Sequence, residues 1–326
     1  MIPCVFLIFS QRTRLLLSSL GRDHASATTV YKLEKPAVIH ALEDMSDSSR
    51  FAGKVAIVTG SSNGMGRATA ILFAQQGAKV TITGRNAERL EQTRQAILDS
   101  KVEPEHVLAV QADLTTEAGQ DELVEKTIAK FGRLDILVNS AGGAFLDAQG
   151  RTGVVQNIEV FDKGMQINLR TIVRLTQKAT PHLIASKGEI VMVSAIGAGT
   201  HASPQFIFEA MPKAALNQFT MSAAIDLIKH GVRVNSVSPG FVKTGFGAAL
   251  GVPDAAFNDM MDFMASHKEC IPYGAVAEPV EIAHVIAFLA DRKLSGYIIG
   301  QSIVVDGGSS LLMGADAHDF QKLMGM

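Results

Sequence analysis

The fold of this chain is decided by the stretch Val55-Ala-Ile-Val-Thr-Gly-Ser-Ser-Asn-Gly-Met-Gly-Arg-Ala-Thr-Ala70. It opens with a short run of apolar and β-branched residues, which predicts a strand covered on both faces of a sheet. Glycines at positions 60, 64 and 66 interrupt the run, and a sequence without proline follows as far as Gln76. A strand that passes through a glycine-rich turn directly into a helix is the opening unit of a parallel α/β sheet.

The same alternation continues along the chain. Strands are predicted at residues 55–59, 79–83, 107–111, 136–139, 190–194, 233–237 and 302–305. Helices are predicted at residues 66–76, 87–100, 118–131, 161–186, 213–229 and 279–289. Because most strand runs are continuously apolar and the connections are short, the sequence predicts an α/β fold. The expected architecture is a doubly wound parallel sheet of about seven strands with helices on both faces, the Rossmann fold.

The chain divides into an N-terminal extension at 1–44, one α/β domain at 45–308 and a C-terminal tail at 309–326. The extension has no acidic residue before Asp23, and its apolar run at 2–9 is far shorter than the roughly 20 residues that span a bilayer. It is compatible with a targeting segment, a mitochondrial presequence. However, the sequence from Met45 also looks like a complete start, which would make 1–44 a spurious upstream extension. We favour the second interpretation and expect a cytoplasmic protein, or a mitochondrial one if the presequence is real.

Composition excludes several classes of function. The 326 residues are 47% hydrophobic and 19% charged, so a large core is available. A formal net charge of −2 gives no reason to expect nucleic acid or an anionic membrane as a partner. The two cysteines, Cys4 and Cys270, suggest neither a disulfide framework nor a metal cluster, so no metal site is expected.

The glycine-rich turn is predicted to bind the pyrophosphate of a dinucleotide. Glycines let the backbone approach a phosphate closely, and the following helix offers free N–H groups and the positive end of its dipole. The strand before the turn and the helix after it supply the context that such a motif requires. The predicted ligands are Gly60, Ser61, Ser62, Asn63, Gly64, Met65 and Gly66.

The end of the second strand predicts which dinucleotide binds. NAD-binding sites usually carry an acidic residue there, which holds the ribose 2′-hydroxyl. In this chain the strand ends Thr83-Gly84-Arg85, without a carboxylate. Arg85 offers a planar cation for a 2′-phosphate, so we expect NADP(H) rather than NAD(H). Asp113, at the end of the third strand, is expected to accept from the adenine amino group, although such acids are often only helix caps.

Several ordered motifs resemble one family, the short-chain dehydrogenases/reductases. Residues 59–66 match its TGxxxGxG motif, residues 139–142 resemble its NNAG segment, and residues 238–244 resemble the segment that lines the nicotinamide. The resemblance covers residues 51–308 and implies an oxidoreductase that acts on an alcohol/carbonyl pair. It adds predicted cofactor contacts at Asn139, Ala141, Gly142, Lys213, Pro239, Gly240, Val242 and Thr244. It also implies catalytic roles for Ser194 on the substrate oxygen, Lys213 on the nicotinamide ribose and Asn168 on a relay water.

The chain departs from the family at its most important motif. The family has Tyr-x-x-x-Lys, and Glu209 stands four residues before Lys213 in place of the tyrosine. A lysine so close is expected to lower the pKa of Glu209, which leaves a base for alcohol oxidation but a poor acid; burial would have the opposite effect. Pro212 predicts that the helix begins near residue 211 or 212, which would leave Glu209 on a loop. Glu209 is then either catalytic or a solvated surface acid.

Two functions remain open. The first is an NADP(H)-dependent oxidoreductase that interconverts an alcohol and a carbonyl on a small lipophilic substrate, using Glu209, Lys213, Ser194 and Asn168. The second is an NADP-binding pseudoenzyme that acts through assembly or partner binding; a local sequence error at 208–212 would also explain the departure. The Met- and Phe-rich segment 245–274 is either a lid or, as we favour, the core of a short helix. The resemblance and the apolar tail imply a homodimer or homotetramer.

Overall fold

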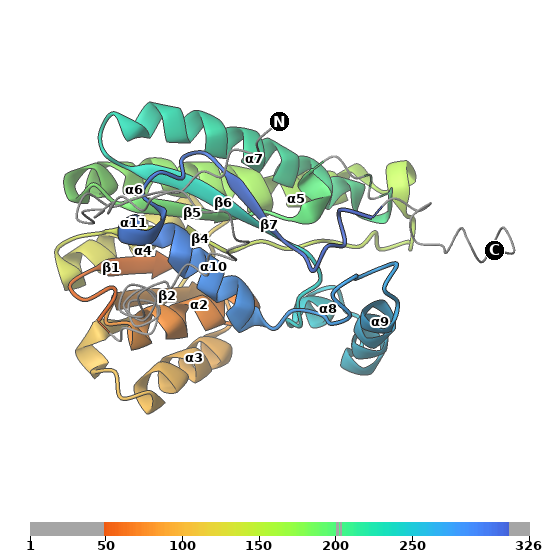
Figure 1. The fold of residues 1–326 in the computed structure, drawn as a ribbon, viewed down its shortest axis with the longest axis horizontal. Coiled ribbons are helices and arrows are strands. Elements are labelled where there is room, and N and C mark those ends of the chain that lie inside the picture. The colour runs from red at the N-terminus through yellow and green to blue at the C-terminus, as the bar shows by residue number, and fades with distance from the viewer. Residues whose placement is uncertain (1–48, 200–201, 203, 313–326) are drawn as a thin grey trace, which may run out of the picture. The chain divides into compact units, whose positions relative to one another are not determined.

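A computed structural model describes residues 49–199, 202 and 204–312. These residues belong to one compact unit that begins at Met45 (Figure 1). The extension 1–44 lies outside the described residues, and so does the tail from residue 313 onward, including Met313 and Met324. The predictions made for these segments therefore stay predictions.

The sheet has the predicted architecture. Seven parallel strands lie in the order β3-β2-β1-β4-β5-β6-β7. The strands are β1 (Val55–Val58), β2 (Lys79–Gly84), β3 (Val107–Gln111), β4 (Ile136–Asn139), β5 (Glu189–Val193), β6 (Arg233–Pro239) and β7 (Ser302–Val305). The order reverses between β1 and β4, and ligands of such sheets bind outside the carboxyl ends of the strands at this switch point.

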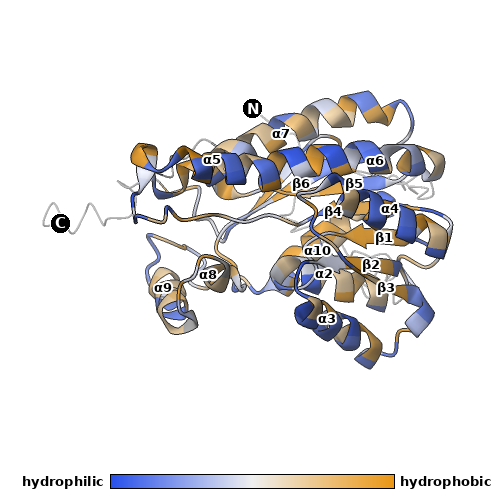
Figure 2. Ribbon diagram, turned by 180° about the vertical axis from the view of Figure 1, so that it is seen from behind, coloured by the Kyte–Doolittle hydropathy of each residue, from blue (hydrophilic) through white to orange (hydrophobic). Residues whose placement is uncertain are grey.

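Helices cover both faces of the sheet, as predicted (Figure 1). The helices that pack on it are α2 (Gly64–Gln75), α3 (Ala87–Asp99), α4 (Glu117–Phe131), α6 (Thr171–Ser186), α7 (Ile207–Ile228) and α10 (Pro279–Ala290), and α5 (Ile158–Met165) packs against α7. Successive strand residues point to opposite faces, so Val58 packs in the core beneath α2 and α10, and Ile57 packs in the core beneath α4 and α6. Figure 2 shows hydrophobic strands between helices whose outer surfaces are largely hydrophilic.

Two predicted helix boundaries are wrong. The helix expected at 161–186 is interrupted by a π-helical turn, η3 (Gln166–Arg170), which separates α5 from α6. The helix expected to begin near Pro212 begins at Ile207, so Glu209 lies in its first turn and not on a loop. Pro212 has no N–H group, so it cannot donate to the Phe208 carbonyl one turn earlier in the helix. The Phe208 carbonyl oxygen lies close to Gly164, and a β-carbon built at Gly164 would be only 2.5 Å from it. The absence of a side chain at Gly164 leaves room for this carbonyl.

A small satellite cluster follows β6. The chain forms α8 (Phe246–Ala249) and α9 (Asp254–Ser266), and Phe257 and Met261 of α9 are buried against Ile271 and Val276. The interpretation of the Met- and Phe-rich segment as helix core holds for these two residues and for the partly buried Phe246 and Met264. Met260 and Phe263 instead lie exposed on the outer side of α9.

The sequence predicts neither a membrane-spanning helix nor a metal site. None of the helices in the described part of the chain has the length and apolar character needed to cross a bilayer. Among the same residues, no group of three or more His, Cys, Asp or Glu side chains is gathered as a metal would require.

Candidate active site

The phosphate-binding turn has the close approach that its glycines predict. Gly60 has a φ of +64°, and a β-carbon at Gly66 would lie 2.5 Å from the Gly60 carbonyl oxygen. No residue with a side chain fits at Gly66 without displacing the turn. Asn63 is the N-cap of α2, and its Oδ1 accepts from the Gly64 amide at 2.7 Å. The helix therefore begins directly at the turn, with its N-terminal amides available to an anion.

A cleft of about 270 Å³ opens at this turn. Most of the predicted cofactor residues line it: Gly60, Ser62, Asn63, Gly64, Met65, Gly66, Arg85, Asp113, Ala141, Gly142 and Thr244. Four residues that no motif predicted as cofactor contacts also line it: Arg89, Ser140, Gly143 and Phe246. Arg89 follows Arg85 by four residues, and this spacing at the start of a helix was the available signal.

The other predicted cofactor residues serve the fold. Ser61 is buried, with its hydroxyl donating to the Val58 carbonyl and accepting from the Thr83 amide, each at 2.8 Å. Asn139 is also buried and donates to Thr176 at 3.3 Å. Pro239 ends β6, Val242 is buried and the Gly240 amide donates to the Val305 carbonyl at 3.0 Å; none of the three lines the cleft, and neither does Lys213. At a strand end, some side chains face the ligand and others face the interior of the protein. The position of a residue in the motif did not reveal which of these directions its side chain takes.

The adenosine end of the cleft is cationic. Arg85 and Arg89 are both exposed, and neither guanidinium forms an ion pair within the described residues. Gly84 has no room for a carboxylate side chain, because a β-carbon there would lie 2.8 Å from the Ser62 hydroxyl. Asp113 lines the cleft and also caps the turn, accepting from the amide and hydroxyl of Thr115, and these bonds lower the pKa of its carboxyl.

Asn168 and Lys213 meet at Gly142. A β-carbon at Gly142 would lie 2.7 Å from Asn168 Oδ1 and 3.3 Å from Lys213 Nζ. Lys213 is buried, and its Nζ donates to the Val193 carbonyl at 2.8 Å. Asn168 sits in the π-helical turn and holds Gly143 on both sides, accepting from its amide at 3.0 Å and donating to its carbonyl at 2.7 Å. The ammonium group and the amide thus lie together at the edge of the cofactor cleft.

Glu209 lies one helical turn before Lys213 on α7 and is half-buried. Burial raises the pKa of its carboxyl above the ordinary 4.5, and the charge of Lys213 offsets only part of that effect. The expected lowering of this pKa is therefore wrong in direction, because removal from water outweighs the neighbouring charge. Burial likewise lowers the pKa of Lys213, against the opposing effect of Glu209. A solvated surface carboxylate does not fit this environment.

The Glu209 side chain borders a cavity of about 10 Å³, roughly the space of one water molecule. Gly143 and Gln156 share this cavity, together with the apolar side chains of Phe145, Val160, Phe206 and Phe208. Gly143 also lines the cofactor cleft. The cavity at Glu209 and the cofactor cleft are therefore neighbouring spaces that share Gly143.

Ser194 lies apart from these groups. Its side chain is buried, and its hydroxyl is directed at the main-chain oxygen of Lys213, 3.4 Å away. It lines neither the cofactor cleft nor the cavity at Glu209. The neighbouring Ala195 has no hydroxyl. This geometry opposes the predicted contact between Ser194 and a substrate oxygen, because the motif did not reveal which side of the strand end the hydroxyl faces.

A family model described as enoyl-(acyl carrier protein) reductase matches residues 60–310. The chain belongs to the short-chain dehydrogenase/reductase family. The match extends from the phosphate-binding turn to beyond β7, and the seven-stranded parallel sheet is the fold of its relatives. Members of this family are oxidoreductases with a nicotinamide cofactor.

Relatives of this short-chain dehydrogenase/reductase act on varied substrates. It is 36% identical over 264 residues to the 3-oxoacyl-[acyl-carrier-protein] reductase FabG of Thermotoga maritima, a match that spans 79% of this chain and 98% of the relative. A Caenorhabditis elegans short-chain dehydrogenase/reductase of unknown function, solved with cofactor, is 59% identical with a TM-score of 0.82, covering 83% of this chain and 100% of that one. A C. elegans glucose dehydrogenase in the apo form is 55% identical with a TM-score of 0.70, covering 81% and 100%.

The meeting point at Gly142 yields a first prediction. Gly142→Ala is expected to weaken NADPH binding by about tenfold or more, since overpacking of this kind costs about 1–3 kcal/mol. The added methyl group would collide with Asn168 Oδ1 and press on Lys213 Nζ. A fluorescence titration of NADPH measures the effect.

Gly197→Ala is the matched control, because a β-carbon at Gly197 would meet only Ala210 Cβ, at 3.9 Å, and Gly197 does not line the cofactor cleft. Its NADPH affinity should remain within about twofold of the parent, as an ordinary van der Waals contact imposes no overpacking. If both substitutions weakened NADPH binding equally, the close contact at Gly142 would not be the cause.

Proposed function

We propose that this chain is an NADP(H)-dependent oxidoreductase that interconverts an alcohol and a carbonyl on a small lipophilic substrate, with Glu209 as the proton donor and acceptor. The observation that carries the proposal is the position of Glu209 one helical turn before Lys213 on α7, beside a cavity that shares Gly143 with the cofactor cleft. Burial raises the pKa of the carboxyl and lowers the pKa of the amine. Opposed shifts of this kind are typical of groups that exchange protons.

The residues of the cleft fit the cofactor. The glycine turn leaves no side chain between the backbone and a pyrophosphate, and two guanidinium groups without an ion-pair partner among the described residues line the adenosine end. The bound cofactor would supply or remove the hydride. Lys213 would hold the ribose hydroxyls and stabilise negative charge at Glu209, and Asn168 would hold the Gly142–Gly143 segment in place.

In carbonyl reduction the protonated carboxyl of Glu209 gives its proton to the carbonyl oxygen of the substrate, while the carbonyl carbon of the substrate gains a hydride. Glu209 is left as a carboxylate beside the positive charge of Lys213. In alcohol oxidation the same carboxylate takes the hydroxyl proton. A general acid works best when its pKa lies near the working pH, and burial moves the pKa of Glu209 in that direction. Ser194 has no part in this scheme, because its hydroxyl faces Lys213 O.

Apolar surroundings support a lipophilic substrate. Aromatic side chains line the cavity beside Glu209, the segment between β4 and α5 exposes Leu146, Val154 and Val155, and Ile158 is exposed at the start of α5. The turn at Gly153–Val155 contacts the turn at Pro204–Phe206, which directly precedes α7. Adjacent exposed apolar residues often mark a ligand or partner surface.

Assembly into a homodimer or homotetramer is part of the proposal. The outer side of α7 exposes Met221, Ile225 and Ile228, and Leu311 is 82% exposed near the last described turn. Apolar residues repeating at this helical spacing form a stripe that a second subunit could cover.

Selectivity for NADPH gives a second prediction. Arg85→Ala is expected to weaken NADPH binding by about tenfold or more and to change NADH binding by less than about twofold, because a hydrogen bond to a charged group contributes about 1.5–3 kcal/mol. Arg94→Ala on α3, the helix that follows Arg85, is the control, since Arg94 pairs with Glu91 and does not line the cleft. Equal weakening of both nucleotides by Arg85→Ala would contradict the 2′-phosphate assignment.

The experiment that tests the function is a titration of the purified full chain with NADPH and NADH, followed by single-turnover oxidation of bound NADPH with a panel of apolar aldehydes and ketones. The proposal expects NADPH binding and loss of the nicotinamide absorbance with at least one carbonyl. Binding without hydride loss across the panel would favour the NADP-binding pseudoenzyme. Failure to bind either nucleotide would contradict the cofactor assignment itself.

A further inference from the structure

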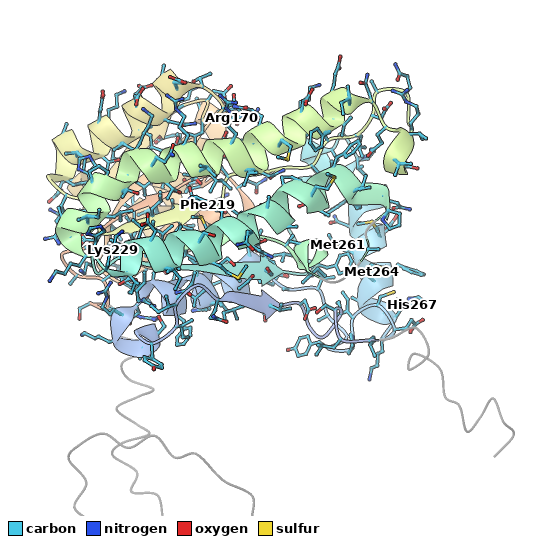
Figure 3. All side chains as sticks on the ribbon, turned by 90° about the horizontal axis from the view of Figure 1, so that it is seen from above. Arg170, Phe219, Lys229, Met261, Met264 and His267 are labelled. Carbon is cyan, nitrogen blue, oxygen red and sulfur yellow. The ribbon has the colours of Figure 1, made fainter. Side chains whose placement is uncertain are left out.

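A second cavity, distinct from the small one at Glu209, also borders the cofactor cleft and has a volume of about 680 Å³. It is bordered by the N-terminal turns of α2, by α9 and by the start of α10. Figure 1 shows α8 and α9 beside these helix ends, and Figure 3 labels Met261 on α9. The two spaces share Asn63, Gly64, Thr244 and Gly245, which contact one another across their boundary.

The boundary between the two spaces is closely packed. A β-carbon at Gly64 would lie 3.0 Å from Thr244 Cγ2, and one at Gly245 would lie 2.0 Å from Asn63 Nδ2. The phosphate-binding turn and the segment after β6 therefore touch, with the cofactor cleft and the second cavity on either side of this contact. The proposed catalytic groups Glu209, Lys213 and Asn168 do not line the second cavity.

Much of the lining is apolar. Ala68 and Ile71 come from one side of α2, Phe257 and Met261 are one turn apart on α9, and Val280 lies in the first turn of α10. Val280 is 46% exposed even though it faces this space. These residues therefore give the cavity an apolar lining on the α2, α9 and α10 sides, where Phe257 and Met261 contribute the small part of their surfaces that the satellite cluster leaves uncovered.

The charges of the lining leave one cation without a partner. Lys243 Nζ pairs with Glu278 at 3.3 Å, and Glu278 also takes part in the capping box of α10. Arg67, on the same side of α2 as Ile71, is half-buried and forms no ion pair or side-chain hydrogen bond within the described residues. Two cations and one carboxylate therefore line the cavity, an excess of one positive charge.

We propose that this cavity binds an amphipathic monocarboxylate, with its carboxylate on the Arg67 guanidinium and its apolar body between α2 and α9. A guanidinium binds a carboxylate through two parallel hydrogen bonds, and the excess of one charge matches a monoanion. Ligand pockets of about 300–1,000 Å³ are typically apolar with a few placed polar groups, and this cavity has that size and composition. The site is separate from the proposed catalytic groups and does not rest on the proposed function.

The test measures binding without turnover. The full chain, saturated with NADPH, is titrated with 11-(dansylamino)undecanoic acid, and the dansyl fluorescence reports binding; dodecanoate and dodecylamine then compete. Dodecanoate is expected to displace the probe at least about tenfold better than dodecylamine, which has the same tail and the opposite charge, because the latter would face Arg67 unpaired. Arg67→Glu and Val280→Asp are each expected to weaken probe binding by about tenfold or more.

Control variants separate this site from the rest of the surface. Arg94→Glu makes the same charge change on α3, and Leu311→Asp places a carboxylate on an exposed leucine outside the cavity. Both should leave probe affinity unchanged, as should Glu209→Gln. Two results would overturn the proposal: probe binding that survives both Arg67→Glu and Val280→Asp, or binding that Glu209→Gln abolishes, which would assign the probe to the catalytic pocket.

Discussion

Glu209→Gln is expected to lower the single-turnover rate of carbonyl reduction by about 100-fold or more, the usual contribution of a positioned general acid. The amide keeps the shape of the carboxyl group but has no proton to give. Affinity for NADPH should stay within about twofold of the parent, because Glu209 borders only the small cavity of about 10 Å³ and does not line the cofactor cleft. Rapid mixing of the NADPH complex with an accepted carbonyl compound measures the rate.

Glu125→Gln is the matched control for this change. Glu125 lies exposed on α4, outside both cavities, and its substitution should leave the rate unchanged. If Glu209→Gln turned over as fast as the parent, Glu209 would have no role in proton transfer and another group would have to be found.

Arg233→Leu is expected to reduce the free energy of unfolding by about 3–5 kcal/mol, the range measured when one member of a buried ion pair is removed. Arg233 is only 2% exposed, at the start of β6. Its guanidinium donates to the carbonyls of Ser295 and Leu289 at 2.7 and 2.8 Å, and it forms an ion pair with Glu189 at 2.8 Å. Leucine would remove these donors, leaving the Ser295 carbonyl with the Ile298 amide and the Leu289 carbonyl with the Ser295 hydroxyl, and would take one of two ion-pair partners from the buried Glu189.

Urea unfolding of the parent and the variant, followed by circular dichroism, measures this difference. Arg94→Leu is the control, because its ion pair with Glu91 is solvated and is expected to contribute less than about 1 kcal/mol. Midpoints that fall equally in both variants, or not at all, would mean that the Arg233 contacts do not hold α10 and the following chain to the sheet.

The sheet could be predicted from sequence because its strands are buried on both faces. Such strands are continuous β-branched runs, and all seven were expected within a residue or two of their observed bounds. Their order follows from right-handed crossovers and the glycine turn after the first strand. The burial of Arg233 could not be predicted in the same way. A charged residue at the start of a strand normally indicates the surface, and Arg233 is buried because it donates to the carbonyls of Ser295 and Leu289, which are distant in the sequence.

The helix boundaries at the site could not be predicted because they depend on tertiary contacts. Pro212 predicts a helix start, but the missing side chain at Gly164, on another helix, lets α7 begin five residues earlier. The π-helical turn that carries Asn168 likewise gave no local signal. Both features determine how the candidate catalytic residues are presented.

The site was predicted best where backbone geometry selects the residue type. The glycines of the phosphate turn each meet a close contact that only glycine permits, so their motif identified them correctly as part of the cleft. Side-chain direction was less accessible, and Ser61, Asn139 and Ser194 proved to hydrogen-bond within the fold. The pKa direction of Glu209 depends on burial, which no pattern of charges along the sequence reports.

The measurement that tests the central claim most directly is the pH dependence of single-turnover carbonyl reduction in the parent and in Glu209→Gln. Burial raises the pKa of Glu209 above 4.5, so the carboxyl keeps its proton below that raised value and loses it as the pH increases through it. The account predicts a parent rate that falls with increasing pH through this ionisation, and a variant rate that is low without this step. A parent profile without the ionisation, or one that the variant reproduces, would contradict the assignment of Glu209 as the proton donor.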